Sequence, residues 1–375
     1  MRAAVLRGAG AGVEVEDVDL DAPHPGEVRV RVEAAGVCHT ELHYISGDIG
    51  CPLPVVLGHE GVGVVEEVGA GVGDMVAGER VVFTWRPRCG ECEYCVTGRP
   101  VMCVYGRVQA SSGGLMDGTS RLHRGNEEIH HFLGVSCFAE LAVVSRRAVV
   151  PIADDIPAAV AAVVGCAVVT GVGAVLNVAA QHGSIAGHPL LVVGAGGVGL
   201  SAVMGAHLLG AAPLVAVDVS ADKLQLARRL GATDVVDASA LPEAEVAGTV
   251  RELTRGGAEV AVEAVGSAST LRQAFEALKP GGRVIAVGLS SAKTEASVPL
   301  NQLVQQQKHL VGSLYGSSNP AVDLPRLLEL YRTGQLPLGQ LVGETYPLED
   351  LGTAYDKLRG GAVGRAVIDP SLVPA

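Results

Sequence analysis

The sequence feature that most limits the possible folds is a glycine-rich turn between an apolar run and a second apolar segment. Residues 190–199 read Leu-Leu-Val-Val-Gly-Ala-Gly-Gly-Val-Gly, so the run ends in a G-x-G-x-x-G turn at Gly194, Gly196 and Gly199. The chain stays largely apolar from there to Gly210, which predicts a helix. A buried strand, this turn and a helix are typical of a βαβ unit that binds a dinucleotide.

Each residue of the turn has an expected part in binding. Gly194 makes the tight turn, Gly196 lets the backbone approach the pyrophosphate, and Gly199 lets the helix pack closely on the strand. Gly197 and Val198 fall at the helix N-terminus, where phosphates bind. The alternative is a purely structural glycine turn.

An acidic residue follows at the distance that such a site requires. Asp218 closes the next strand, 19 residues after Gly199, and is expected to accept hydrogen bonds from the adenosine ribose and to repel a 2′-phosphate. This pattern favours NAD over NADP, although Asp218 as a helix N-cap is the alternative. Lys223 is a candidate ribose contact or a solvated helix lysine.

Two patterns divide the chain. The first 150 residues alternate short β-branched runs with Gly and Pro turns, which predicts a mainly-β region. From about Pro151 the pattern becomes strand, glycine turn and helix in repeated units, as in a doubly wound parallel sheet. Six strands are expected there, at 190–193, 214–217, 234–236, 260–264, 283–287 and 309–314. A helix at 323–333 and a strand at 366–368 are expected to return to the first region.

Charge and hydropathy exclude several kinds of partner. A net charge of −12 leaves no basic surface for nucleic acid or for an anionic membrane. The N-terminus has no apolar signal segment, so a cytoplasmic protein is expected. Residues 158–176 lack charge over a length that reaches the range of a membrane span. Gly165, Gly171 and Gly173 interrupt them, which favours a buried helix pair or a helix and turn.

Four cysteines lie close together in the first region. Cys89, Cys92, Cys95 and Cys103 form C-x2-C-x2-C-x7-C in a loop with Gly and Pro. Four neighbouring thiolates suit a closed tetrahedral structural zinc site. An iron–sulfur cluster also takes four cysteines and is the alternative.

A second candidate metal site is dispersed. Its candidate ligands are widely spaced in the sequence: Cys38, His59, Glu60 and Cys166. Taken singly, each cysteine could equally be a thiol of the hydrophobic core, and His59 could be a hydrogen-bonded histidine in a turn. Spacing alone leaves this site open.

Several short motifs occur in an order that resembles a known family. These are Gly36-Val-Cys-His-Thr40, Gly58-His-Glu-Gly61, the four-cysteine loop, Asp117-Gly-Thr-Ser-Arg121, Ile129-His-His-Phe-Leu-Gly134, Gly165-Cys166 and the G-x-G-x-x-G turn. Over nearly its whole length the chain resembles zinc-dependent medium-chain alcohol dehydrogenases, in the long, loop-containing branch that includes thiol-dependent formaldehyde dehydrogenases.

The resemblance implies an α/β fold of two domains. A GroES-like, mainly-β catalytic domain is implied for residues 1–168 and 315–375, and a doubly wound Rossmann coenzyme domain for residues 169–314. Cys38, His59 and Cys166 are implied to hold a catalytic zinc, with Glu60 as a neighbouring or transient ligand. Where many relatives carry Asp, position 41 is Glu, so a longer or rerouted contact to the zinc histidine is expected.

The resemblance also assigns catalytic and cofactor roles. It implies that Thr40 and His43 relay the proton, that His39 and Arg365 contact the pyrophosphate, and that Trp85 forms a wall of the substrate pocket. Phe132 and Leu133 are expected nearby, so that an apolar alcohol fits better than a charged one. Cys51 and Cys137 belong to neither metal set and are expected to be free thiols.

The expected activity is therefore NAD-dependent, zinc-dependent interconversion of primary aliphatic or aromatic alcohols and aldehydes. Two alternatives share the fold: oxidation of the adduct of formaldehyde with a small thiol, and a nicotinoprotein in which NAD stays bound. Arg86, Arg88 and Arg107 are the candidate carboxylate-binding residues for a thiol adduct, or else solvate the four-cysteine loop. A non-catalytic binding protein is a third alternative, against which the intact zinc and relay residues argue. The resemblance also implies a homodimer, with a tetramer as the alternative.

Overall fold

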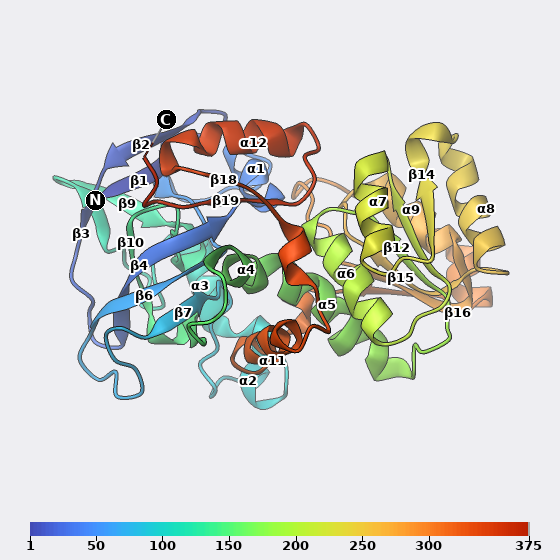
Figure 1. The fold of residues 1–375 in the computed structure, drawn as a ribbon, viewed down its shortest axis with the longest axis horizontal. Helices are drawn as coiled ribbons and strands as arrows, with labels where there is room; N and C mark the ends of the chain where they lie inside the picture. The colour runs from blue at the N-terminus through green and yellow to red at the C-terminus, as the bar shows by residue number, and fades with distance from the viewer. Residues whose placement is uncertain (374–375) are drawn as a thin grey trace. The chain divides into compact units, whose positions relative to one another are not determined.

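The computed structural model describes residues 1–373, which divide into two compact units (Figure 1). The first unit contains Met1–Cys166, Asn319–Arg332 and the chain from Leu338 onward. The second contains Ala167–Ser318 and Thr333–Pro337.

Two sheets build the first unit. The six-stranded sheet has the order β2-β1-β5-β9-β8-β3, and the seven-stranded sheet has the order β11-β7-β6-β4-β19-β18 with β10 also paired to β4. The strands of the first sheet are β1 (Arg2–Leu6), β2 (Val13–Asp17), β3 (Asp19–Leu20), β5 (Val55–Val56), β8 (Leu122–Arg124) and β9 (Glu127–His131). Those of the second are β4 (Glu27–Gly36), β6 (Gly61–Val68), β7 (Arg80–Phe83), β10 (Leu141–Ser145), β11 (Val149–Pro151), β18 (Val342–Tyr346) and β19 (Arg365–Ile368).

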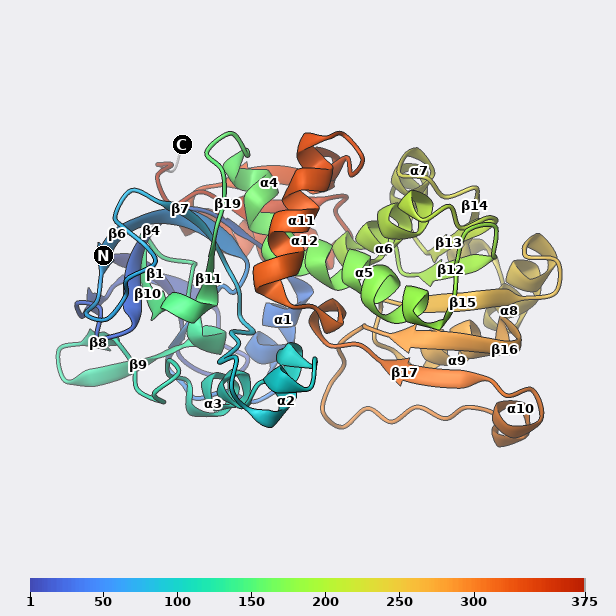
Figure 2. The same ribbon diagram turned by 90° about the horizontal axis from the view of Figure 1, so that it is seen from below.

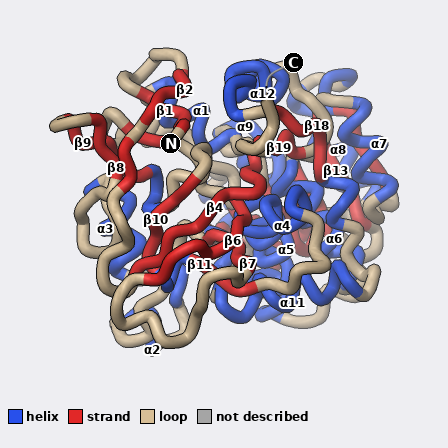
Figure 3. The backbone as a smooth tube through the Cα atoms, turned by 60° about the vertical axis from the view of Figure 1, so that its left-hand side comes forward, coloured by secondary structure: helices blue, strands red, loops and turns tan. Residues whose placement is uncertain are grey.

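Strand β4 is the centre of this unit, as Figure 3 shows beside β6 and β7. Val28, Val30 and Val32 alternate along it and are buried, which is the period of two that a strand with one apolar face requires. They pack into a core with Phe83, Phe138 and other apolar side chains. The helices of this unit are α1 (His39–Ser46), α2 (Glu93–Val96), α3 (Val104–Ser112), α4 (Ala158–Val163), α11 (Pro320–Arg332) and α12 (Leu351–Arg359).

The second unit is a parallel sheet in the order β14-β13-β12-β15-β16-β17, which confirms the doubly wound fold. Figure 2 shows β15, β16 and β17 side by side, with β17 at the edge. Its strands are β12 (Leu190–Val193), β13 (Leu214–Asp218), β14 (Asp234–Asp237), β15 (Ala258–Glu263), β16 (Leu278–Ala286) and β17 (His309–Gly312). Its helices are α5 (Val169–Gly173), α6 (Gly197–Leu208), α7 (Ala221–Arg229), α8 (Glu243–Leu253), α9 (Ala268–Glu276) and α10 (Leu300–Gln305).

The uncharged segment near residue 160 differs from the expectation. Ala158–Ala179 is one continuous helical run of 22 residues, not a helix pair, and 89% of its most apolar window is buried in the protein, as in a core helix. Its glycines are points of close approach rather than breaks. A Cβ on Gly165 would lie 2.8 Å from the carbonyl oxygen of Phe83, and one on Gly171 would lie 2.1 Å from that of Val198.

Candidate functional site

Four buried side chains of the first unit bring their metal-binding atoms together. The donor atoms of Cys38, His59, Glu60 and Cys166 all lie within 4.8 Å of one another, and the Cys166 Sγ lies 3.4 Å from His59 Nε2. Two thiolates and one imidazole form the ligand set by which alcohol dehydrogenases themselves hold a catalytic zinc. The residues therefore fit a zinc ion.

Different elements of the first unit supply these donors. Cys38 is the N-cap of α1, directly after β4, and His59 and Glu60 precede β6. Cys166 lies in a π-helical stretch, Val164–Val168, that follows α4. Such π-helical turns frequently occur at functional sites, because they redirect a side chain within a helix.

Glu41 connects two of the metal donors. Its Oε2 accepts a hydrogen bond from the Cys38 backbone N–H at 3.0 Å, and its Oε1 lies 2.6 Å from His59 Nδ1. The expected longer or rerouted contact was wrong: as the third residue of α1, Glu41 closes a capping box and still reaches His59 directly.

This contact fixes the orientation of the imidazole. Burial lowers the pKa of His59, but the Glu41 carboxylate and the Cys38 thiolate outweigh that effect and raise it well above its usual value. The 2.6 Å contact places Nδ1 to donate to the Glu41 carboxylate, and Nε2 faces Cys166 and the metal position.

Glu60 and Arg365 form a buried ion pair at the edge of the donor set. The Arg365 Nη2 lies 3.1 Å from Glu60 Oε2 and 3.5 Å from Cys38 Sγ. Burial raises the pKa of Glu60 to about 8 despite the positive charge of Arg365. Gly36 makes room for this pair, since a Cβ there would lie 2.6 Å from Glu60 Oε1.

The two thiols of the site differ in their proton affinity. A hydrogen bond with Cys166 and the charge of Arg365 hold the pKa of Cys38 well below its usual range, whereas the pKa of Cys166 is raised. The pair therefore shares one proton, and a metal ion that binds both thiolates displaces it.

Aromatic side chains border the imidazole. Trp85 and Phe132 both meet His59 edge to face, with ring centres 6.0 Å and 5.7 Å apart. Tyr44, which the sequence did not single out, packs against Phe132 at 4.8 Å, and Leu133 is buried with a positive φ of 51°. The side of the donor set that these rings line is apolar.

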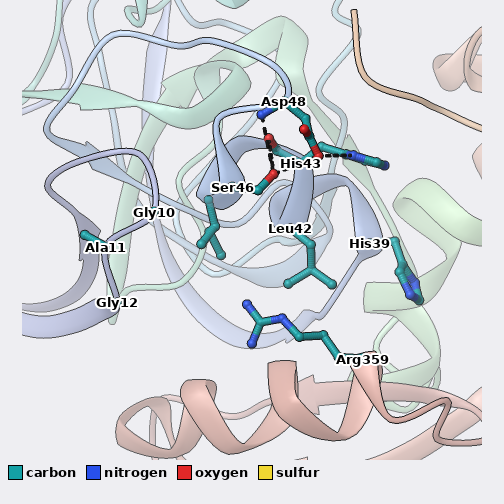
Figure 4. A pocket seen from close by; sticks show the side chains of 10 residues that line it. Gly10, Ala11, Gly12, His39, Leu42, His43, Ser46, Asp48 and Arg359 are labelled. Atoms are coloured by element: carbon teal, nitrogen blue, oxygen red, sulfur yellow. Dashed lines mark hydrogen bonds and ion pairs between the residues drawn. The ribbon is translucent and has the colours of Figure 1, made fainter. Parts of the chain in front are cut away.

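An open pocket of the first unit holds the two histidines that follow Cys38 (Figure 4). His39, Leu42 and His43 of α1 line it together with Asp48 and Arg359, the last residue of α12. The His43 Nδ1 lies 3.4 Å from Asp48 Oδ2, and the Ser46 hydroxyl donates to the same oxygen at 2.9 Å.

Thr40, the residue after His39, lies beside the metal donors. Its Oγ1 is 3.4 Å from Cys38 Sγ, so its hydroxyl is at the edge of the donor set. Asp48 and Arg359 are residues that sequence reasoning missed, because neither belongs to a recognisable motif.

The glycine turn of the second unit has the geometry of a phosphate cradle. Gly194 has a φ of +95°, and a Cβ on Gly199 would lie 1.7 Å from the Gly194 carbonyl oxygen. A Cβ on Gly196 would meet no atom within 4 Å, so the backbone at the start of α6, with Gly197 and Val198, is open to a ligand.

Asp218 ends β13 beside this turn. Its Oδ2 accepts a hydrogen bond from the Ala195 N–H at 2.6 Å and its Oδ1 accepts one from the Ser220 N–H at 2.9 Å. The carboxylate is half-buried and fixed next to the turn, and Lys223 follows in the first turn of α7.

The four-cysteine lobe, residues Cys89–Cys103, forms a second donor set in the first unit. Its four Sγ atoms lie within 4.8 Å of one another, with Cys89 to Cys95 at 3.9 Å and Cys92 to Cys103 at 4.0 Å. Zn–S bonds of about 2.3 Å in a tetrahedron give S···S distances of about 3.8 Å, so the lobe fits a zinc ion. The backbone N–H groups of Val104 and Cys95 lower the pKa of Cys92 to about 6, which favours its thiolate.

Comparisons with known proteins agree with both donor sets. One family model, the alcohol dehydrogenase GroES-like domain, matches residues 24–154, and a second, the zinc-binding dehydrogenase, matches residues 197–332. An NDMA-dependent alcohol dehydrogenase of Amycolatopsis methanolica is 41% identical over 98% of both chains. An S-(hydroxymethyl)glutathione dehydrogenase of Komagataella pastoris is 34% identical over 90% of this chain and 89% of its own. The crystal structure of benzyl alcohol dehydrogenase from Acinetobacter calcoaceticus has a TM-score of 0.91 and 32% identity, and covers 98% of both chains.

These matches explain why two cysteine-rich donor sets and a dinucleotide-type glycine turn occur in one chain. Similarity at this level over nearly the full length also shows the reaction class, an oxidoreductase that uses zinc and a nicotinamide nucleotide. The chain therefore belongs to the zinc-dependent medium-chain alcohol dehydrogenase family.

Proposed function

We propose that this alcohol dehydrogenase interconverts primary aliphatic or aromatic alcohols and their aldehydes with NAD. The observation that carries the proposal is the buried donor set of Cys38, His59 and Cys166, with Trp85 and Phe132 edge-on to its imidazole. An apolar alcohol tail packs against aromatic rings, whereas a charged tail would lose its hydration there without a partner.

The proposed chemistry divides between the metal and the chain. Cys38, His59 and Cys166 would hold the zinc ion, which would supply Lewis acidity to an alcohol and so ease the loss of its hydroxyl proton. Thr40, at the edge of the donor set, takes that proton. His43, whose side chain is 28% exposed in the open pocket, passes it to solvent.

For the nucleotide we propose NAD rather than NADP. The fixed Asp218 carboxylate lies beside the glycine turn, where it suits a ribose hydroxyl and repels a 2′-phosphate. His39 and Arg365 remain proposed contacts of the pyrophosphate, and Lys223 of the ribose. Arg365 is 5% exposed and paired with Glu60, so its guanidinium also holds the metal donor set in place.

A second candidate function is a nicotinoprotein, in which NAD stays bound and a second substrate recycles it. The relative with 41% identity over 98% of both chains carries an NDMA-dependent activity in its name. The thiol-adduct formaldehyde activity is the third form of this chemistry, and the relative from Komagataella pastoris carries it in its name.

One experiment separates these forms. The zinc-replete protein is mixed with a series of primary and benzylic alcohols and NAD or NADP, and NADH formation is followed by near-ultraviolet absorbance. Parallel samples contain formaldehyde with a small thiol, or an alcohol with NDMA and no added nucleotide. Turnover with alcohols and free NAD supports the proposal. Turnover confined to NDMA, with nucleotide released on denaturation, supports the nicotinoprotein, and turnover confined to the adduct supports the third form.

We also propose a homodimer, formed through the edge strand β17 of the second unit. Leu310 on this strand is 44% exposed, and Leu300 and Val304 of the neighbouring α10 are exposed as well. An unpaired edge with apolar side chains is suited to pairing across a two-fold axis. Light scattering after size-exclusion chromatography tests this, and a mass of four chains would favour the tetramer instead. A cytoplasmic location stays a prediction.

A further inference from the structure

A cavity of about 290 Å³ in the first unit lies beside the four-cysteine lobe and is lined by arginines. Arg86 and Arg88 directly precede the lobe, and Arg146 and Arg147 follow β10. Asp74 is the single carboxylate among the lining residues. Because the chain carries a net charge of −12, four converging arginines are a local exception that needs a cause.

Two neighbouring arginines in this cavity are held by different parts of the unit. Arg146 forms a two-pronged pair with Asp74, in which both N–O distances are 3.0 Å. Arg147 instead donates from Nη1 to the carbonyl oxygen of Cys89, the first cysteine of the lobe. Arg147 thus ties the beginning of the lobe to the end of β10.

Arg86 reaches the other end of the lobe. Its guanidinium lies 4.8 Å from the centre of the Trp85 ring and packs against Gly106, three residues after Cys103. A Cβ on Gly106 would lie 2.9 Å from Arg86 Nη1. Among the residues that the structure describes, no carboxylate pairs with Arg86, and its buried Nε has no hydrogen-bond partner.

Gly106 shows that this placement has a cost. It lies within α3 without a positive φ, and glycine there destabilises a helix by about 1 kcal/mol relative to alanine. Its missing side chain is the space that the Arg86 guanidinium occupies. Helix α3 therefore contains a residue of low helix propensity at the position where the Arg86 side chain packs.

The negative charge of the four-cysteine lobe explains why arginines gather beside it. Four thiolates around one Zn²⁺ leave an excess of two negative charges, and Glu91 and Glu93 add to them. Burial lowers the pKa of Arg86, while the negative charges of Tyr44 and Cys103 act against that effect.

We propose that Arg86 and Arg147 are positioning residues for the zinc of the four-cysteine lobe. They offset its negative charge, tie its two ends to the surrounding unit, and thereby slow the loss of the metal. The proposal rests on zinc in the lobe and is independent of the alcohol, the nucleotide and the proton relay.

The test follows the accessibility of the lobe thiols. The zinc-loaded protein is mixed with a chelator and N-ethylmaleimide, and peptide mass spectrometry measures the labelling rates of Cys89–Cys103 and, separately, of Cys38 and Cys166. We expect Arg147→Gln to label the lobe at least about 10-fold faster, the effect of losing one hydrogen bond from a charged group. We expect Arg86→Gln, which loses a positive charge beside the thiolates, to label it up to about 5-fold faster. Arg146→Gln is the matched control, since Asp74 and not the lobe holds that side chain.

A second set of variants keeps the test valid if the glutamine variants fold poorly. In Gly106→Ala the new methyl group would lie 2.9 Å from Arg86 Nη1 and would displace the guanidinium, so we expect faster lobe labelling even though alanine is the better helix former. In the double variant Arg86→Ala/Gly106→Ala, the added methyl group has nothing to displace. The lobe cysteines of the double variant are therefore expected to be labelled no faster than those of Arg86→Ala alone.

Labelling of Cys38 and Cys166 distinguishes this role from a general loss of stability. If Arg147→Gln and Arg86→Gln accelerate the labelling of both sites equally, or match Arg146→Gln, the proposal is overturned. It is also overturned if Gly106→Ala slows lobe labelling, because the glycine then serves no guanidinium. Arg147→Lys, which retains the charge, is expected to fall between the wild type and Arg147→Gln.

Discussion

The two metal donor sets of the first unit are built in opposite ways. The four-cysteine lobe draws all its ligands from the 15 residues Cys89–Cys103, and two of its four cysteines stay half-exposed. The other set takes Cys38, His59 and Cys166 from three separate elements and buries each of them. The first site takes its ligands from one short stretch of the chain, whereas the second takes them from elements far apart in the sequence.

The residues around the two donor sets therefore have different roles. A site with four thiolates is complete in its ligands and needs compensation for its charge, which Arg86 and Arg147 are placed to give. A site with three protein ligands keeps a position for substrate, so its ligands need fixed orientations. Glu41 and the Glu60–Arg365 pair provide them.

The largest effect is expected at the dispersed site. His59→Ala removes a zinc ligand, and we expect kcat/KM for a primary alcohol to fall by a factor on the order of 10³ or more, because metal activation of the alcohol is lost. The zinc content is expected to fall by one equivalent while the lobe keeps its own. Cys51→Ser is the control, since burial raises the pKa of this thiol to about 11 and it belongs to neither set. Unchanged activity in His59→Ala would contradict the assignment.

A lobe ligand is expected to affect stability more than chemistry. Cys92→Ser opens the tetrahedral site, so the free energy of metal binding no longer supports the fold, and we expect the Tm to drop by roughly 5–10 °C. Activity per folded molecule at low temperature is expected to stay within about threefold of the wild type, because the lobe contributes no ligand to the dispersed site. A large loss of kcat with an unchanged Tm would mean that the lobe takes part in the chemistry.

A smaller effect is expected when the imidazole loses its orienting carboxylate. Glu41→Gln retains the shape of the side chain but removes the charge that holds the proton on His59 Nδ1. We expect a loss of about 10- to 100-fold in zinc affinity at the dispersed site or in kcat/KM. The zinc of the lobe serves as the internal reference in the same sample, and equal loss from both sites would indicate general unfolding.

A pH-dependent effect on stability is expected from a buried histidine outside both donor sets. Burial, together with the nearby positive charge of Arg121, lowers the pKa of His131 to about 3, and its Nε2 accepts the Arg121 backbone N–H at 3.2 Å. Because the folded pKa lies below the unfolded value, this group stabilises the fold above about pH 6.5, and the contribution is lost as the pH falls toward 3.

Unfolding by urea at several pH values measures this contribution. Between pH 6.5 and 4 the stability of the wild type is expected to fall by up to about 1.4 kcal/mol per pH unit more steeply than that of His131→Gln. Glutamine can still accept the Arg121 N–H. Equal slopes would show that His131 is protonated in the folded protein.

The contiguous parts of the molecule were predictable from the sequence. The strand, glycine turn and helix at 190–210 and the C-x2-C-x2-C-x7-C lobe each lie within a short stretch, so local backbone geometry and ligand spacing suffice to recognise them. The strands expected in the second unit are confirmed for the same reason. The continuous helix Ala158–Ala179 was missed, because its glycines serve neighbours far away in sequence, such as Phe83 and Val198.

The sequence by itself determined a doubly wound unit, a four-thiolate lobe and, through its motifs, the family. Only the tertiary structure decided that Glu41 still reaches His59, that Arg365 is buried against Glu60 and Cys38, and that Arg86 fills the space beside Gly106. These contacts join residues separated by 18 positions or more, or depend on which way a long side chain turns. The packing of the surrounding helices and strands fixes the distances between these side chains, and the spacing of residues in the sequence does not encode that packing.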